Sequence, residues 1–250
     1  MGGFFTALYR RERLVTIASL AIVVALCVLV MQRSGDRVMM VDPGTDSILY
    51  SSLVFVMWWT MMMAMMLPTA VPALLTDAAI ARKWSPNEDP ARLRIAFALG
   101  YVAIWSAFAL AATVVNIVAG QYIQMTPMMA ITSKIIGILV LAGAGLYQLT
   151  PAKQACLVKC QSPIAFAPGQ WHAGSQAAFK RGIAHGIFCM GCCGVLMLLL
   201  FYGGVMEANW IGGLALYLLV EKLTPAQWRL HQLTGGLLII WAVLLALSLI

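Results

Sequence analysis

Residues 181–202 read RGIAHGIFCMGCCGVLMLLLFY, an apolar run long enough to cross a membrane as a helix. One imidazole and three thiols interrupt it, on His185, Cys189, Cys192 and Cys193. Polar and ionisable side chains are costly in hydrocarbon and usually mark function there. The run therefore predicts a transmembrane helix that carries a functional site.

The rest of the chain has the composition of a membrane protein. Of its 250 residues, 62% are hydrophobic and 10% are charged, whereas soluble domains have about 25% charged residues. We therefore expect an all-α, polytopic transmembrane helix bundle that forms one integral membrane domain, residues 1–250. The apolar stretches predict about seven spans, near 14–31, 48–75, 93–119, 128–149, 181–202, 206–221 and 233–250.

The basic residues predict the orientation of these spans. With seven spans, thirteen of the sixteen Lys and Arg residues fall in the N-terminal segment and the loops on its side, and only Arg33 and Arg37 fall opposite. The positive-inside rule then predicts N-in/C-out topology in a bacterial inner (cytoplasmic) membrane, with the lipid bilayer as a partner. The same charges are scattered over short loops, which argues against nucleic acid binding.

The thiols and the imidazole of 181–202 share one helix face. At about 100° per residue, His185, Cys189 and Cys192 fall within an arc of roughly 60°, with Cys193 beside it. Thiolates bind copper(I), zinc or iron–sulfur clusters. Two other interpretations stay open: a free Cys is often a small apolar packing residue, and the C-x-x-C of Cys189 and Cys192 is a spacing used in thiol–disulfide exchange.

A dense methionine strip in 48–75 offers further soft donors. Met57, Met61 and Met65 recur every four residues, and thioethers favour copper(I), although Met also fills irregular gaps in cores. Because the second and fifth spans run in opposite directions, both donor groups lie near mid-membrane. We expect a copper(I) site built from His185, Cys189 and Cys192 with Met61 or Met65, and with Cys193 in reserve.

Four other features of the sequence bear on the function. Cys156 and Cys160 have a C-x-x-x-C spacing in a predicted cytoplasmic loop, 150–180, and are either secondary metal-capture candidates or unrelated thiols. Glu221 and Lys222 end a predicted span, and we interpret them as an interfacial pair at a helix C-terminus. Whether Glu207 or Lys134 is functional stays open: Glu207 is either an exposed interfacial residue or, if its turn dips into the membrane, a proton or cation ligand, and Lys134 is placed to extend toward the outer interface.

Several of these residues also carry a family resemblance. The matching pieces are Trp58–Pro68 (WWTMMMAMMLP), His185–Cys193 (HGIFCMGCC), Gly203–Met206 (GGVM) and Glu221–Lys222 with Pro225. With them the chain resembles a bacterial family of predicted metal-binding integral membrane proteins of unknown function. It departs from that family at Gly194, where Trp is usual, and at Glu207, where Asn is common. The resemblance implies metal binding and names neither metal nor reaction.

Copper is the metal that the donor set favours, with zinc or iron as alternatives. We expect the protein to handle copper or to deliver it to a partner metalloprotein or membrane complex. Two other classes stay open: a membrane oxidoreductase that uses the thiols or the bound metal, and an assembly or scaffold subunit without metal. Whether the protein is an enzyme therefore stays open.

Overall fold

A computed structural model describes residues 2–41, 46–84, 88–161 and 174–248. Within these residues the regular structure is helical, and the turn after α3 holds an isolated β-bridge between Met125 and Ile131. In chain order the helices are α1 (Gly2–Met40), α2 (Ser47–Trp84), α3 (Pro90–Tyr122), α4 (Lys134–Gln148), α5 (Pro151–Gln161), α6 (Ser175–Met197), α7 (Leu199–Gly203), α8 (Ala208–Leu223), the 3₁₀ turn η2 (Ala226–Trp228) and α9 (Leu230–Leu247).

Local sequence signals explain where several helices begin. Asp89 caps α3 by accepting a hydrogen bond from the Ala91 backbone N–H, and Pro90 occupies the first helical position, where its missing N–H costs nothing. Ser133 caps α4 in the same way. Pro151 starts α5 after the end of α4, and the two helices are bent by 65° at this break. The bend turns α5 back toward the other helices.

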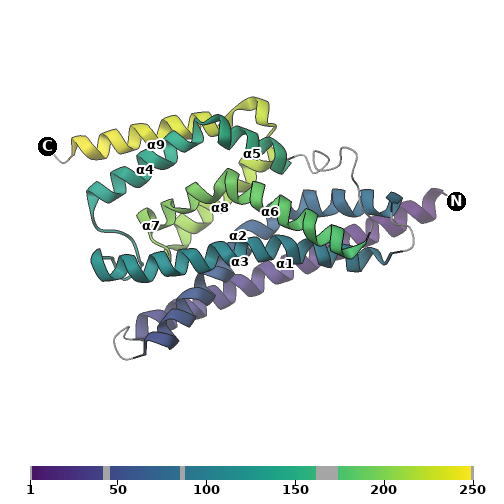
Figure 1. Ribbon diagram of the computed structural model, residues 1–250, viewed down its shortest axis with the longest axis horizontal. Helices are drawn as coiled ribbons and strands as arrows, with labels where there is room; N and C mark the ends of the chain where they lie inside the picture. The colour runs from purple at the N-terminus through teal and green to yellow at the C-terminus, as the bar shows by residue number, and fades with distance from the viewer. Residues whose placement is uncertain (1, 42–45, 85–87, 162–173, 249–250) are drawn as a thin grey trace.

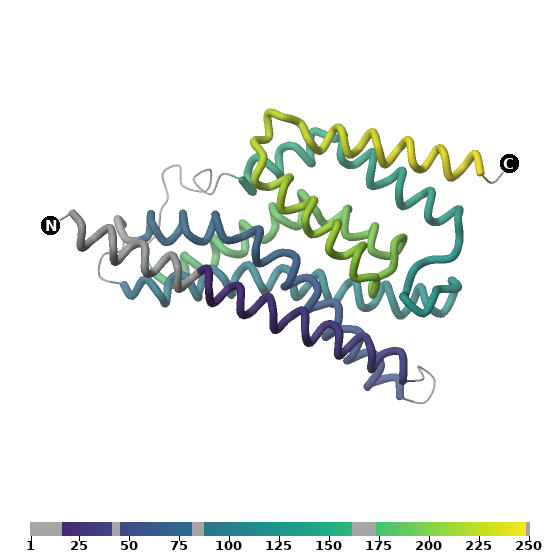
Figure 2. The backbone as a smooth tube through the Cα atoms, turned by 180° about the vertical axis from the view of Figure 1, so that it is seen from behind, coloured from purple at the N-terminus to yellow at the C-terminus, as the bar shows by residue number. Residues whose placement is uncertain are grey.

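The helices form three groups (Figure 1; Figure 2). Helices α4 and α9 lie side by side along one edge, α1, α2 and α3 form the opposite edge, and α6, α7 and α8 lie between them. The main packing partners are α3 with α6, α1 with α2, α4 with α9, α2 with α3, and α5 with α6. Helix α6 is therefore the element around which the other groups assemble.

The all-α expectation is confirmed, whereas the count of seven spans is not. Five helical segments are long and apolar enough to cross a membrane, within Ile17–Met40, Ser47–Ala81, Pro90–Tyr122, Ser175–Gly203 and Ala226–Leu247, and the bent pair α4–α5 makes up to six. The segment expected at 206–221 forms α8, whose 16 residues are about 24 Å long at ~1.5 Å per residue. That length is short of a hydrocarbon core of about 30 Å.

Glycines let α3 and α6 approach backbone to backbone. A Cβ added at Gly182 would lie 2.0 Å from the Phe97 carbonyl oxygen, and one added at Gly100 would lie 2.2 Å from the Phe179 carbonyl oxygen. No larger residue fits either position without separating the helices. Small residues commonly allow this close backbone approach in membrane helix pairs. This contact holds α3 against the face of α6 that carries the histidine and the cysteines.

Candidate metal centre

The chemically important face of α6 points into the protein. His185, Cys189, Cys192 and Cys193 are each at most 2% exposed, as the helical spacing predicted. The thiols of Cys192 and Cys193, at the end of this face, turn back toward the helix. Their Sγ atoms lie 3.1 Å and 2.9 Å, respectively, from the Cys189 carbonyl oxygen. The three sulfurs therefore occupy one buried region along α6.

Cys189 is the point where three helices meet. Its Sγ accepts a hydrogen bond from the Lys222 Nζ of α8 at 2.8 Å and lies 3.1 Å from the Tyr101 hydroxyl of α3. Lys222 also donates to the Thr69 hydroxyl at 3.0 Å, and the Tyr101 hydroxyl donates to the Met66 carbonyl oxygen at 3.1 Å. The thiol is thus enclosed by a cation and a phenol anchored to α2.

Helix α5 adds a fourth thiol to this region. The expected cytoplasmic loop 150–180 is wrong for residues 151–161, because they form a helix that packs against α6. Cys160 is buried and interacts with Cys189 and Cys192. We call Cys160, Cys189, Cys192 and Cys193 the thiol cluster.

Cys156 lies outside the thiol cluster. Its side chain packs on the backbone of α6, where a Cβ added at Gly191 would lie 2.8 Å from the Cys156 Sγ. The C-x-x-x-C pair is therefore divided, since Cys160 joins the other thiols and Cys156 packs against Gly191. The part of the predicted loop at 162–173 lies outside the described residues.

His185 has no hydrogen-bond partner in the described structure, at either ring nitrogen. Its ring packs on Tyr101 and Phe97, with centroids 5.5 Å and 5.8 Å apart. Buried polar atoms are rarely left unpaired, and each exception calls for an explanation such as an absent ion. A neutral imidazole nitrogen one helical turn from Cys189 is available as a metal ligand.

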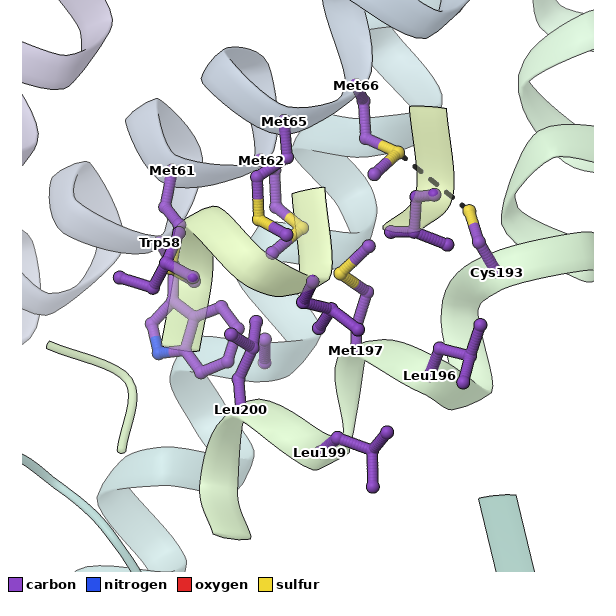
Figure 3. Close-up of a cluster of buried hydrophobic side chains, with 14 of the residues drawn as sticks. Trp58, Met61, Met62, Met65, Met66, Cys193, Leu196, Met197, Leu199 and Leu200 are labelled. Carbon is purple, nitrogen blue, oxygen red and sulfur yellow. Dashed lines mark hydrogen bonds between the residues drawn. The ribbon is translucent and has the colours of Figure 1, made fainter. Parts of the chain in front are cut away.

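The methionine strip of α2 packs against α6 and α7 (Figure 3). We use this name for five methionines that are each at most 3% exposed: Met57, Met61, Met62, Met65 and Met66. The Met66 sulfur lies 3.8 Å from the Cys193 Sγ, whereas Met61 lies beside Trp58 toward the other end of the close-up. Met66 is therefore the thioether in contact with the thiol cluster, and the sequence had emphasised Met61 and Met65 instead.

A second buried ionic network contacts the backbone of the thiol cluster at Cys192. Lys153 of α5 pairs with Glu221 of α8 at 2.8 Å and also donates to the Cys192 carbonyl oxygen. Tyr217 donates to the other Glu221 oxygen at 2.8 Å, and Gln148 donates to the Tyr217 hydroxyl at 3.0 Å. The network ties α4, α5, α6 and α8 together with its charges paired, as burial requires.

The interfacial ion pair expected for Glu221 and Lys222 is therefore wrong. Adjacent residues on a helix point about 100° apart, so Glu221 reaches Lys153 while Lys222 reaches Cys189. Sequence reasoning missed Lys222 and Tyr101 as members of the site. The signal for Lys222 was an ionisable residue beside a long apolar stretch, which marks function by default; Tyr101 gave no such signal.

The donors suit a soft ion with few ligands. Among the described residues, no three His, Cys, Asp or Glu side chains already converge in a geometry that could hold a metal ion. Thiols and thioethers together select copper(I) over harder ions. A copper site here therefore needs Met66 as a ligand or a small rearrangement of the thiols.

Comparison with known proteins identifies the family. Residues 55–245 match the family described as "PpoB2: Copper chaperone", and the match includes the methionine strip, the thiol cluster, His185 and Lys222. No curated protein and no solved structure matches the chain. A match over residues 55–245 of 250 shows that the chain belongs to the PpoB2 family of copper chaperones.

Proposed function

We propose that this protein is a membrane-embedded copper(I) chaperone whose cargo binds at the thiol cluster and is delivered to a partner metalloprotein. Cys189 and Cys192 are the principal donors, His185 and Met66 are neutral donors beside them, and Cys193 and Cys160 are in reserve. The observation that carries the proposal is the buried contact of the Cys189 Sγ with the Lys222 Nζ at 2.8 Å. Five to six apolar helices support the membrane location. The basic residues that precede the first apolar run favour an N-terminus in the cytoplasm of a bacterium.

Charge balance explains why a lysine belongs at such a site. Copper(I) with two thiolates carries one net negative charge, which is costly in a medium of low dielectric constant. One ammonium group brings the assembly to neutrality. Without copper, the same ammonium is compensated by the Cys189 thiolate, which is the form that binds metals. Lys222 therefore suits both the empty and the loaded site.

Neutral ligands complete the coordination without changing this balance. The Met66 thioether and the His185 imidazole add no charge when they bind a metal. Met66 already lies 3.8 Å from the Cys193 sulfur, and His185 has two unpaired nitrogens. Exchange among several weak neutral ligands around two thiolates suits a carrier, which must release its cargo as well as bind it.

Copper content tests the proposal directly. The full chain, purified in detergent and loaded anaerobically with copper(I), is washed with a competing chelator and measured by elemental mass spectrometry. We expect about one copper to be retained per chain and to be lost in Cys189→Ser/Cys192→Ser. Cys27→Ser is the matched control, because Cys27 is a buried thiol of α1 outside the thiol cluster.

The outcomes separate the functional classes. Copper that persists in the double serine variant would overturn the thiol cluster as the cargo site. Zinc or iron in place of copper would overturn the cargo assignment. A redox signal that disappears with Cys189→Ser, without any bound metal, would favour the oxidoreductase over the chaperone.

A further inference from the structure

A cavity of about 510 Å³ lies at the end of the bundle where α1 and α3 finish and α2 begins. Residues 123–127 and Met129, which follow α3, form one wall, and Met206 from the α7–α8 turn forms another. None of these residues belongs to the thiol cluster. The cavity reaches the surface, since Tyr122 on its rim is 82% exposed.

Four methionines from three parts of the chain line this cavity, namely Met39, Met125, Met129 and Met206. We call it the methionine cavity. Methionine inside a core fills gaps, but here the thioethers border open space. Thioethers are soft, neutral ligands that favour copper(I). They also need no deprotonation to bind, unlike the thiols of the deeper site.

Asn116 supplies an independent indication that the cavity receives a ligand. This α3 residue is only 2% exposed and lines the cavity, and its Nδ2 has no hydrogen-bond partner. A buried donor left unpaired costs about 1–3 kcal/mol. A water or counter-anion held beside a bound ion would pair with this amide.

The methionine strip connects the cavity to the thiol cluster. Along α2, Tyr50 lines the cavity and Met66 contacts Cys193, a separation of sixteen residues or about 24 Å at ~1.5 Å per residue. Met57, Met61, Met62 and Met65 occupy the interval, and Figure 3 shows the last three beside Met66. Met129 belongs to the same continuous buried core as the strip. Soft donors therefore extend from the cavity to the thiols.

We propose that the methionine cavity is a second copper(I) site, formed by thioethers, through which the deeper site exchanges its cargo. The inference rests on the proposed function, because it takes copper(I) to be the cargo. Its ligands are Met125, Met129 and Met206, with Asn116 beside them. Neutral thioethers bind copper(I) less tightly than thiolates do, so this site fills after the thiol cluster and empties first.

Anaerobic titration with copper(I) against a chromophoric chelator tests this proposal. We expect the wild-type chain to bind about two ions with different affinities. Cys189→Ser/Cys192→Ser should lose the tight one, and Met125→Leu/Met129→Leu/Met206→Leu should lose the weak one. Met128→Leu is the matched control, because Met128 lies in the same segment and does not line the cavity. X-ray absorption of the serine variant should show sulfur around the remaining copper.

Each result decides one of the two proposals. If the triple leucine variant still binds both ions, the methionine cavity is not a copper site, while the thiol cluster stands. If the serine variant keeps both ions, the thiol cluster is overturned and the cavity is judged by its own variant. If the triple variant folds poorly, Met206→Leu alone tests the cavity, with its folding checked by size-exclusion chromatography. An unchanged weak site in Met206→Leu would overturn the cavity as a copper site.

Discussion

The thiol cluster and the methionine strip pack against each other but differ in charge. Around the thiols, the structure buries an ammonium, a phenol and a second ion pair: Lys222, Tyr101 and Lys153–Glu221. The strip is neutral, and its methionines fill the space between α2 and α6–α7. Charge makes the first region specific and intolerant of change, whereas the second is adaptable, because isosteric exchange of Met is usually mild.

The largest effect should follow from removing the thiol that faces the cation. Cys189→Ser removes the thiol that is hydrogen-bonded to the Lys222 ammonium, and breaking a buried pair costs about 3–5 kcal/mol. We expect a large fall in the thermal unfolding temperature in detergent. The double variant Cys189→Ser/Lys222→Met should recover much of it, because the unpaired charge is gone.

Lys222→Met alone isolates the effect of charge on copper. It should lower copper retention while the thiols remain, since the loaded site then keeps a net negative charge. If Cys189→Ser is no less stable than the double variant, Lys222 is not paired with a thiolate, and the contrast between the two regions weakens.

Glu221→Gln tests whether the second ion pair is structural. It leaves Lys153 uncompensated at a site that is fully buried, and the expected loss of stability is again about 3–5 kcal/mol. Copper retained per folded chain should stay unchanged, because Glu221 contacts no thiol. Glu207→Gln is the control, since the Glu207 carboxylate accepts only an exposed hydrogen bond from Asn209 in the described contacts. A loss of copper without a loss of stability would place Glu221 in the metal site instead.

A smaller effect is expected from separating α3 from α6. Gly182→Ala places a methyl group 2.0 Å from the Phe97 carbonyl oxygen, and overpacking of this kind costs about 1–3 kcal/mol. Separating the two helices also moves Tyr101 of α3 away from Cys189 of α6, so the affinity for copper should fall together with the stability.

Gly212→Ala is the control for that variant, because its added Cβ meets nothing within 4 Å. Alanine is a better helix former than glycine by about 1 kcal/mol, so this variant should be neutral or slightly stabilised. Equal melting temperatures for the two variants would contradict the close α3–α6 contact.

The shared face of α6 was predictable because it follows from the helical period within a single helix. His185, Cys189 and Cys192 needed only that geometry to share a side. The partners of that face depended on tertiary packing. The break at Pro151 brings Cys160 inward, and the rotation between Glu221 and Lys222 sends them to different partners. Neither result can be read from the spacing within a single helix. The apolar stretch that becomes α8 was predicted as a span, but the helix is only 16 residues long.

The smallest effect distinguishes the members of the methionine strip. Met66→Leu conserves volume, so the stability loss should stay below about 1.5 kcal/mol. Because its sulfur is the one in contact with Cys193, we expect copper(I) affinity to fall roughly tenfold, or ~1.4 kcal/mol. Met61→Leu, beside Trp58, should leave the tight site unchanged and slow the exchange of copper with the methionine cavity. Competition titration and stopped-flow transfer to a chelator measure the two quantities. Equal affinity losses in both variants would mean that copper binds along the strip and not at its thiol end.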